Sequence, residues 1–182
     1  MAQAMLSARL AARGIAVPVA SAGVLDNGRT PPPEVIAVMA ARGIDVSGHR
    51  SRMVTVDDLA TADLILGLAR EHVRNAAVLL PDAWPRAFTI RELVRRGQRA
   101  SPRAPSERLG DWLTRVADGR GRRDILGDSP ADDVADPTGG PLPGYQSTAD
   151  ALEQLIRDIV DLGWPGRGSL PQSPRPVRDK DF

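Results

Sequence analysis

The stretch Asp63-Leu-Ile-Leu-Gly-Leu68 decides the fold class of this chain. Its apolar side chains do not alternate with polar ones, which is typical of a parallel strand that is covered on both faces. The residues that follow, Glu71 to Leu80, have helical periodicity, and Ala87 to Ile90 is a second short apolar run. A strand, a helix and another strand in succession predict an α/β fold, with a small parallel sheet flanked by helices.

The residues before this unit predict two helices and one more strand. Met1 to Arg13 is apolar at helical spacing, Ile15 to Ala20 has the composition of a buried strand, and Pro33 opens a helix that ends at Gly43. The first helical pattern starts at Met1 itself, with neither a capping residue nor an earlier element. We therefore expect the codons upstream of Met1 to encode a further segment of the fold.

Charge is divided between two neighbouring segments. Residues 86 to 123 hold eleven arginines and four acidic residues, whereas residues 124 to 161 hold nine acidic residues and one arginine. We expect these two segments to face one another, because opposite charges attract. Four apolar residues of the basic segment share one helical face, so this part should pack against the core. They are Leu109, Trp112, Leu113 and Val116.

The end of the chain predicts one more helix and a tail. The helix should begin near Ser147, three residues before Asp150, and end near Gly163. From Pro165 onward the chain is rich in Pro, Gly, Ser and Arg, and too few apolar residues remain to offset the entropy of ordering. We predict one α/β domain over residues 1–164 and a disordered tail over residues 165–182.

The composition excludes several classes of protein. A chain of 182 residues that is 42% hydrophobic and 26% charged fits one soluble domain. Its 24 basic and 23 acidic residues give a net charge of +1, which argues against a nucleic-acid coat protein. No apolar run has the length of a membrane span and no signal-peptide pattern occurs, so we expect a cytoplasmic protein without a membrane partner.

The chain contains no cysteine and only two histidines, His49 and His72. The absence of cysteine excludes a disulfide, a thiolate metal site and a cysteine nucleophile within these residues. Two histidines are too few for a histidine-rich zinc centre. We therefore expect neither a metal nor a cofactor.

Seven short pieces of sequence, in their order and spacing, resemble the low-molecular-weight protein tyrosine phosphatases over about residues 1 to 162. They are Met1-Ala-Gln-Ala-Met5, Gly14-Ile15, Ser21-Ala-Gly23, Gly43-Ile-Asp45, His49-Arg-Ser-Arg52, Ala62-Asp-Leu-Ile-Leu66 and Asp136-Pro137. That family has a four-stranded parallel sheet flanked by helices, and its chemistry starts at a Cys-x5-Arg loop that is followed by Ser-Pro. Met1 matches the residue after this Ser-Pro. The resemblance thus implies that the central first strand, the nucleophile and the arginine lie outside this chain, which is truncated and inactive as given.

The resemblance also assigns roles to three residues that are present. Asp136 matches the general acid, which protonates the leaving phenolate and then activates water against the phosphocysteine. Ser21 and His49 match the hydroxyl and the imidazole that hold the phosphate loop in shape. From the residues alone, ordinary roles are favoured: a turn for Asp136, a strand end for Ser21 and a locally bonded loop residue for His49.

Two departures from the family bear on the substrate. Thr138 and Gly139 stand where the family commonly has aromatic residues, and Val24 to Gly28 on the opposite wall has no aromatic ring. Stacking on phosphotyrosine would therefore be weak. We expect a phosphorylated protein or a small aryl phosphate as substrate, with little preference for tyrosine.

Other functions stay open on the sequence. A non-catalytic phospho-binding protein needs no cysteine, whereas a thioredoxin-linked arsenate reductase needs several. Nucleic-acid binding through residues 86 to 123 is disfavoured, because an acidic segment follows and no aromatic residues are interleaved. A role for Asp136 as a nucleophile lacks the second aspartate that such motifs carry two residues later, where Thr138 stands. The sequence does not indicate an oligomeric state.

Overall fold

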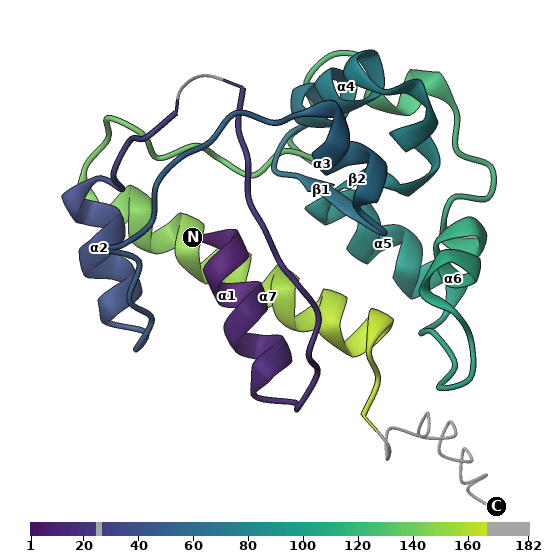
Figure 1. Ribbon diagram of the computed structural model, residues 1–182, viewed down its shortest axis with the longest axis horizontal. Helices are drawn as coiled ribbons and strands as arrows, with labels where there is room; N and C mark the ends of the chain where they lie inside the picture. Colours follow the sequence, from purple (N-terminus) through teal and green to yellow (C-terminus); the bar gives the residue numbers. More distant parts are fainter. Residues whose placement is uncertain (25–26, 167–182) are drawn as a thin grey trace, which may run out of the picture.

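The computed structural model describes residues 1–24 and 27–166 of the chain (Figure 1). Its strands, α-helices and short 3₁₀ helices (η) follow one another in this order: α1 (Ala2–Ala11), α2 (Pro33–Ala40), α3 (Val56–Thr61), β1 (Ile65–Gly67), α4 (Arg70–Leu79), η1 (Pro81–Arg86), β2 (Ala87–Thr89), α5 (Ile90–Ala100), α6 (Leu109–Val116), η2 (Arg122–Ile125) and α7 (Leu142–Gly163). β1 and β2 pair in parallel, with Leu66 opposite Phe88. The predicted α/β fold with a small parallel sheet is therefore confirmed.

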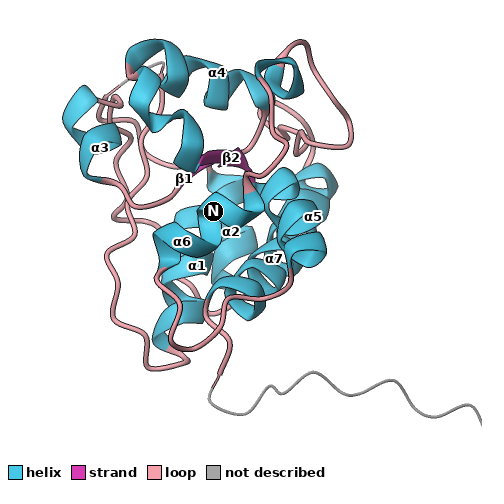
Figure 2. Cartoon of the chain, turned by 90° about the vertical axis from the view of Figure 1, so that its right-hand side faces the viewer, coloured by secondary structure: helices cyan, strands magenta, loops and turns pink. Residues whose placement is uncertain are grey.

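The two strands lie between two layers of helices, as Figure 2 shows. α3 and α4 lie on one side of the strands, and α1, α5, α6 and α7 lie on the other. The second layer holds the main core, in which α7 contacts α1, α2 and α5. α5, α6 and α7 pack closely at Gly97, where an added Cβ would lie 3.1 Å from Leu162 Cδ1 and 3.2 Å from Trp112 Cζ2. The predicted packing of the Trp112 face is confirmed, since Trp112, Leu113 and Val116 are buried.

The predicted buried strand over residues 15–20 is wrong. The segment is extended without belonging to a strand, and most of its side chains are exposed. Within the described part of the chain, the backbone N–H groups of residues 16–22 donate to no backbone carbonyl. Only the next residue, Gly23, is paired, through a parallel bridge to Met53. The physical reason is that a strand requires a neighbouring strand, and none lies beside this segment.

The last helix begins earlier than predicted. α7 starts at Leu142, and Ser147 lies inside it, where its hydroxyl donates to the carbonyl of Pro143 (3.0 Å) instead of capping the helix. Its end at Gly163 agrees with the prediction. Most of the predicted tail, residues 167–182, lies outside the described residues. No helix in the described ranges is long and apolar enough to cross a membrane.

Among the described residues, the two charged segments meet at two ion pairs. Arg95 contacts Asp132, and Arg96 contacts Asp124 (3.1 Å). Other arginines of the basic segment find partners within it, as Arg115 does with Glu107 (2.9 Å). The predicted meeting of the two segments is thus confirmed for these two pairs.

A buried ion pair closes the outer edge of β2. Glu92 accepts hydrogen bonds from Arg120 Nε (2.8 Å) and Nη2 (3.0 Å), and both side chains are at most 3% exposed. The guanidinium lies over the rings of Trp84 and Phe88, at 3.7 and 4.3 Å from the centroids. It also donates to the Ala87 carbonyl (2.5 Å). Burial lowers the pKa of Arg120 from its ordinary value, and the hydrogen bonds to Glu92 oppose this shift.

Candidate functional site

The loop that carries Asp136 is anchored by a buried carboxylate. Asp132 is 2% exposed. Its Oδ2 accepts from Arg70 Nε (2.8 Å) and Nη2 (2.7 Å), and its Oδ1 accepts from Arg95 Nη1. Burial raises the pKa of Asp132, but the hydrogen bonds from Arg95 and Arg70 outweigh it and hold that pKa below its ordinary value. One ionised side chain thus ties the loop to the start of α4 and to the middle of α5.

Three further hydrogen bonds hold residues 133–135, which directly precede Asp136. Asp133 accepts from the backbone N–H of Arg70 (2.8 Å), at the first turn of α4. The N–H of Val134 donates to the carbonyl of Leu68 (2.7 Å), just beyond the end of β1. The hydroxyl of Thr148 donates to the carbonyl of Ala135 (3.1 Å). The loop is therefore held from the sheet on one side and from α7 on the other.

Asp136 itself is exposed at the end of this anchored stretch. Its Oδ1 accepts from the backbone N–H of Thr138 (3.0 Å) and from the Thr138 hydroxyl (2.7 Å). This geometry is an Asx turn that opens toward α7. Unlike Asp132, Asp136 has no arginine or lysine within ion-pair distance among the described residues. Its carboxyl group is thus placed by its own loop and is accessible to a ligand.

A cavity of about 360 Å³ lies beside Asp136. Arg91, at the start of α5, lines it together with Asp136, Ser147 and Thr148. The Nε of Arg91 is buried and has no hydrogen-bond partner among the described residues. The exposed lining of the cavity is mostly apolar, and Arg91, Ser147, Thr148 and Asp136 are its polar residues.

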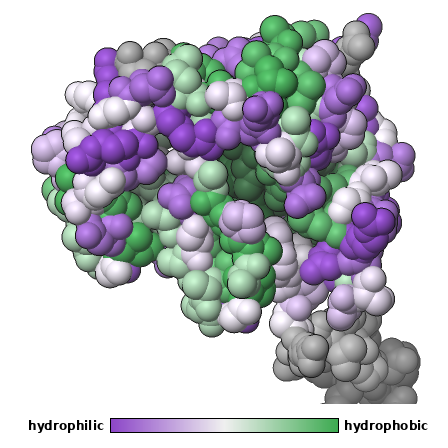
Figure 3. Space-filling model, in the orientation of Figure 1, coloured by the Kyte–Doolittle hydropathy of each residue, from purple (hydrophilic) through white to green (hydrophobic). Residues whose placement is uncertain are grey.

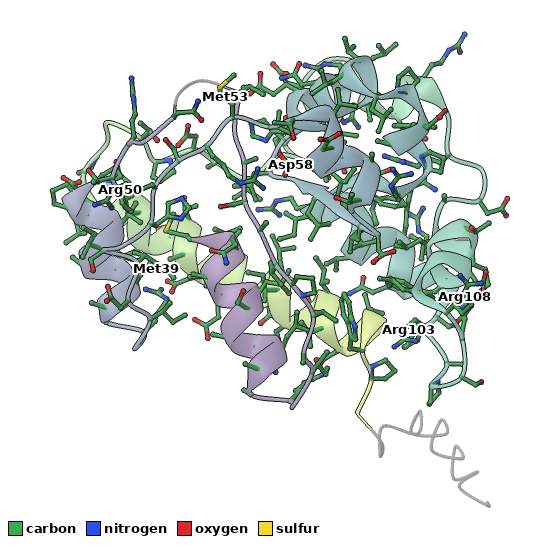
Figure 4. The ribbon with its side chains drawn as sticks, viewed as in Figure 1. Met39, Arg50, Met53, Asp58, Arg103 and Arg108 are labelled. Atoms are coloured by element: carbon green, nitrogen blue, oxygen red, sulfur yellow. The ribbon has the colours of Figure 1, made fainter. Side chains whose placement is uncertain are left out.

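The structure does not join Ser21 or His49 to Asp136. Ser21 lies in the extended segment after α1, and His49 lies in the connection from α2 to α3. Both side chains are exposed and neither makes a side-chain hydrogen bond within the described residues. The same connection carries Arg50 and Met53 (Figure 4). Ser21 and His49 are thus accessible, but no contact of theirs indicates a role.

The connection from α2 to α3 ends at a well-defined ion pair. Arg52 Nη1 donates to Asp58 Oδ2 (2.6 Å), and the N–H of Thr55 donates to the same oxygen (3.0 Å). The hydrogen bond from Arg52, followed by those from Thr55, lowers the pKa of Asp58 to about 2. This pair fixes the start of α3 beside β1.

Sequence reasoning found Asp136 but missed the residues that hold its loop. Asp132 and Asp133 precede Asp136 by four and three residues, and Arg70 is more than 60 residues away. The paired carboxylates after Pro130 were the available signal. Their partners on α4 and α5 could not be identified from spacing, because the pairs form only when the chain has folded.

The first 103 residues match the sequence model of the family described as low molecular weight phosphotyrosine protein phosphatase. This chain belongs to that family. A probable low molecular weight protein-tyrosine-phosphatase of Ralstonia solanacearum, EpsP, is 36% identical over 93 residues, which are 51% of this chain and 62% of EpsP. The matched part thus spans less than two thirds of that relative.

Solved structures of the phosphatase fold superpose on nearly the whole described chain. The low molecular weight protein tyrosine phosphatase of T. tengcongensis has a TM-score of 0.65 at 28% identity, with 88% of this chain and 87% of that chain covered. The YwlE arginine phosphatase of Geobacillus stearothermophilus has a TM-score of 0.60 at 22% identity, with 88% and 80% covered. The second likeness shows a shared fold only. Family membership and fold therefore agree with the resemblance seen in the sequence.

Proposed function

We propose that this low molecular weight phosphatase chain supplies the general acid for hydrolysis of phosphate monoesters through a phosphocysteine intermediate. A cysteine thiolate attacks phosphorus, the bond to the leaving oxygen breaks, and Asp136 gives its proton to that oxygen. Asp136 then takes a proton from the water that attacks the phosphocysteine. The substrate is a phosphorylated protein or a small aryl phosphate.

The accessibility of Asp136 on a rigid loop is the observation that carries this proposal. The neighbouring carboxylates are occupied, since Asp132 binds two arginines and Asp133 binds the start of α4. Asp136 bonds only within its own turn. A general acid has to be held in place and yet be free to transfer a proton, and among these three aspartates only Asp136 meets both conditions.

The nucleophile has to come from outside these 182 residues, because they contain no cysteine. We infer that the chain is inactive unless a Cys-x5-Arg loop is joined to it or bound by it. Ser21 and His49 would then support that loop through hydrogen bonds. Their exposed, unbonded side chains in the described structure are compatible with this role.

The proposal is tested by grafting an apolar strand and a Cys-x5-Arg-Ser-Pro loop ahead of Met1. The grafted protein should hydrolyse p-nitrophenyl phosphate, whereas the 182-residue chain should not. Replacing the grafted cysteine by serine should abolish turnover. Turnover by the 182-residue chain alone, or none by a folded graft, would contradict the proposal.

The role of Asp136 is tested in the same graft. Asp136→Asn should slow hydrolysis of aryl phosphates with poor leaving groups by roughly 10²–10⁴ and affect activated leaving groups less. Asp128→Asn is the matched control, because this residue lies in the same loop with its side chain 90% exposed. An equal loss on all substrates would assign Asp136 to the shape of the loop.

A non-catalytic phospho-binding protein is the second candidate, favoured by the absence of cysteine. It predicts that the 182-residue chain binds phenyl phosphate without hydrolysing it. Isothermal titration of the chain with phenyl phosphate, with Asp136→Asn for comparison, distinguishes this function from an inactive fragment.

A further inference from the structure

The cavity beside Asp136 offers a ligand the donors of one side chain, Arg91. The hydroxyl groups of Ser147 and Thr148 each donate to a backbone carbonyl, at 3.0 and 3.1 Å. A hydroxyl group has a single proton, so neither can donate to a ligand at the same time. Among the side chains that line the cavity, the guanidinium of Arg91 is therefore the group that is left to bind a ligand acceptor.

Arg91 also lacks the counterion that its neighbours on α5 have. Arg95 binds Asp132, and Arg96 binds Glu92 (3.1 Å). No carboxylate lies within ion-pair distance of Arg91 in the described ranges, and its buried Nε has no hydrogen-bond partner there. A partly buried charge without a partner is costly. The positive charge of this side chain is thus available to a ligand anion.

The other residues that line the cavity are apolar, and none of them is aromatic. They are Val134, Ala135, Pro137, Gly144 and Ala151. The cavity volume of about 360 Å³ exceeds the roughly 150 Å³ that is enough for benzene in an apolar cavity. Figure 3 shows a similar division on one face of the molecule, where hydrophilic residues surround a hollow with a hydrophobic floor. A matching ligand has an apolar body of about one ring and an anionic end.

Asp136 indicates which part of a substrate would occupy this cavity. A general acid gives its proton to the oxygen of the leaving group, so the leaving group lies beside it. Asp136 and Arg91 line the same cavity. A leaving group that fills the cavity can therefore place its oxygen beside Asp136 and a second polar end at Arg91. Asp136 carries a proton at that stage and does not repel a negative charge on the leaving group.

We propose that the cavity is a subsite for the leaving group, and that Arg91 selects small aryl phosphates whose phenol carries a carboxylate. This inference rests on the proposed function, because the general acid Asp136 assigns the cavity to the leaving group. A guanidinium binds a carboxylate through two parallel hydrogen bonds. The ion pair takes the place of aromatic stacking, which Thr138 and Gly139 do not supply.

The same arrangement disfavours phosphotyrosine within a protein. In a peptide the carboxyl group of tyrosine is part of an amide bond and has no charge, so it forms no ion pair with Arg91. A free aryl acid keeps this charge at the same distance from the ring. An acid and its amide are therefore matched probes for the role of Arg91.

The binding part of the proposal is tested on the 182-residue chain and needs no nucleophile. In an NMR titration, 3-phenylpropanoate should bind at least fivefold more tightly than neutral 3-phenylpropanamide, because hydrogen bonds to charged groups are the stronger ones. The amide signals of residues 134–137 should shift. Arg91→Gln should remove the difference between the two probes. Arg99→Gln is the matched control, since Arg99 is an exposed arginine in the last turn of the same helix, and it should keep the difference.

The selection of substrates is tested in the grafted protein with 3-(4-phosphonooxyphenyl)propanoate and its amide. Two methylene groups separate the carboxyl group from the ring, so the two leaving phenols have similar acidity. The acid should have a kcat/KM at least fivefold higher than that of the amide. Arg91→Gln should make the two substrates equal by raising KM for the acid, whereas Arg99→Gln should keep the preference.

The outcomes separate this inference from the proposed function. If the graft hydrolyses both substrates equally well, the proposed function holds and the selection by Arg91 is wrong. If the graft hydrolyses neither while the chain binds the acid selectively through Arg91, the proposed function is wrong and the cavity remains a binding site for aryl acids. Equal binding of acid and amide by the parent chain would overturn the inference. Displacement of the acid by an equal concentration of inorganic phosphate would also overturn it, because the site would then bind any anion.

Discussion

The two strands of this small sheet have the same length and pair in register, yet they differ in burial. Ala87, Phe88 and Thr89 of β2 are at most 1% exposed, whereas Gly67 is the one fully buried residue of β1. The difference does not follow from composition, because Ile65 and Leu66 are at least as apolar as Ala87 and Thr89. It follows from neighbours: β2 lies under α4 and α5 and is closed by Arg120, while β1 lacks cover along one edge. The burial of its residues therefore shows that β2 has a covered outer edge and that β1 does not.

The largest expected effect concerns the facing residues Phe88 and Leu66. Phe88→Ala should lower the free energy of unfolding by about 3–5 kcal/mol, because it leaves a cavity in a fully packed site. Leu66→Ala should cost only about 1–2 kcal/mol, since water already reaches part of this side chain. Urea unfolding followed by circular dichroism measures both. Equal losses would mean that β1 is as well packed as β2.

The closed edge of β2 gives the next prediction. Glu92→Gln removes the negative charge beside Arg120 and should lower the free energy of unfolding by about 3 kcal/mol, because the guanidinium stays buried without a counterion. Glu153→Gln is the matched control, since Glu153 is about half exposed in its pairs with Arg157 and Arg42, and each pair should contribute less than about 1 kcal/mol. Similar losses for both variants would show that Arg120 does not depend on Glu92.

A smaller, pH-dependent effect concerns the loop that continues from β1. Asp132 has a pKa below its ordinary value of 3.8 in the folded state, so the unfolded chain binds its proton first as the pH falls. Stability from this group is complete above about pH 4 and is lost as the pH falls from there through the folded pKa. Asp132→Asn should therefore reduce the loss of unfolding free energy that occurs as the pH falls. Unfolding curves of the parent chain and of the variant from pH 5 to pH 2.5 measure this difference. The same dependence of the unfolding free energy on pH in both proteins would contradict the prediction.

The smallest effect distinguishes the ends of the two strands. Thr89, the last residue of β2, accepts a hydrogen bond from the N–H of Glu92 (3.0 Å) and caps α5. Ala69, which precedes α4 after β1, has no side-chain oxygen for this purpose. Thr89→Ala should cost about 1 kcal/mol, with partial rescue by Thr89→Ser. Thr114→Ala, within α6, is the control and should change the melting temperature little.

Most helices and both strands of the sheet were predictable, and the reasons for the misses are physical. The apolar runs at residues 63–68 and 87–90 predicted β1 and β2, and the helical spacing of the apolar residues between them predicted α4. Both patterns were sufficient because they follow directly from which side chains are buried. Residues 15–20 have the same kind of pattern but form no strand, since pairing depends on a neighbour that the local sequence does not specify. α5 was missed because its arginines concealed the core positions Ile90, Leu93, Val94 and Gly97.

The candidate site was predictable at Asp136 and not around it. The resemblance identified this residue through Asp-Pro and its order among other motifs. The anchoring of its loop depends on Asp132 reaching Arg70 and Arg95 across 62 and 37 residues, which no local pattern encodes. The cavity beside it likewise combines Arg91 with residues of α7. Long-range partners of charged residues become known only with the fold.

The contact between α1 and α7 has a consequence for synthesis. Arg13, just after α1, donates to the carbonyls of Val160 (3.3 Å) and Trp164 (3.2 Å), so the first helix docks on the last. At about 5–20 residues per second, the ribosome needs on the order of 10–30 s to add the residues that separate these partners. During that time the apolar side chains Met5 and Leu10 have no α7 to cover them. Until α7 has been synthesised, these side chains stay exposed on the nascent chain, which is the kind of surface that chaperones bind.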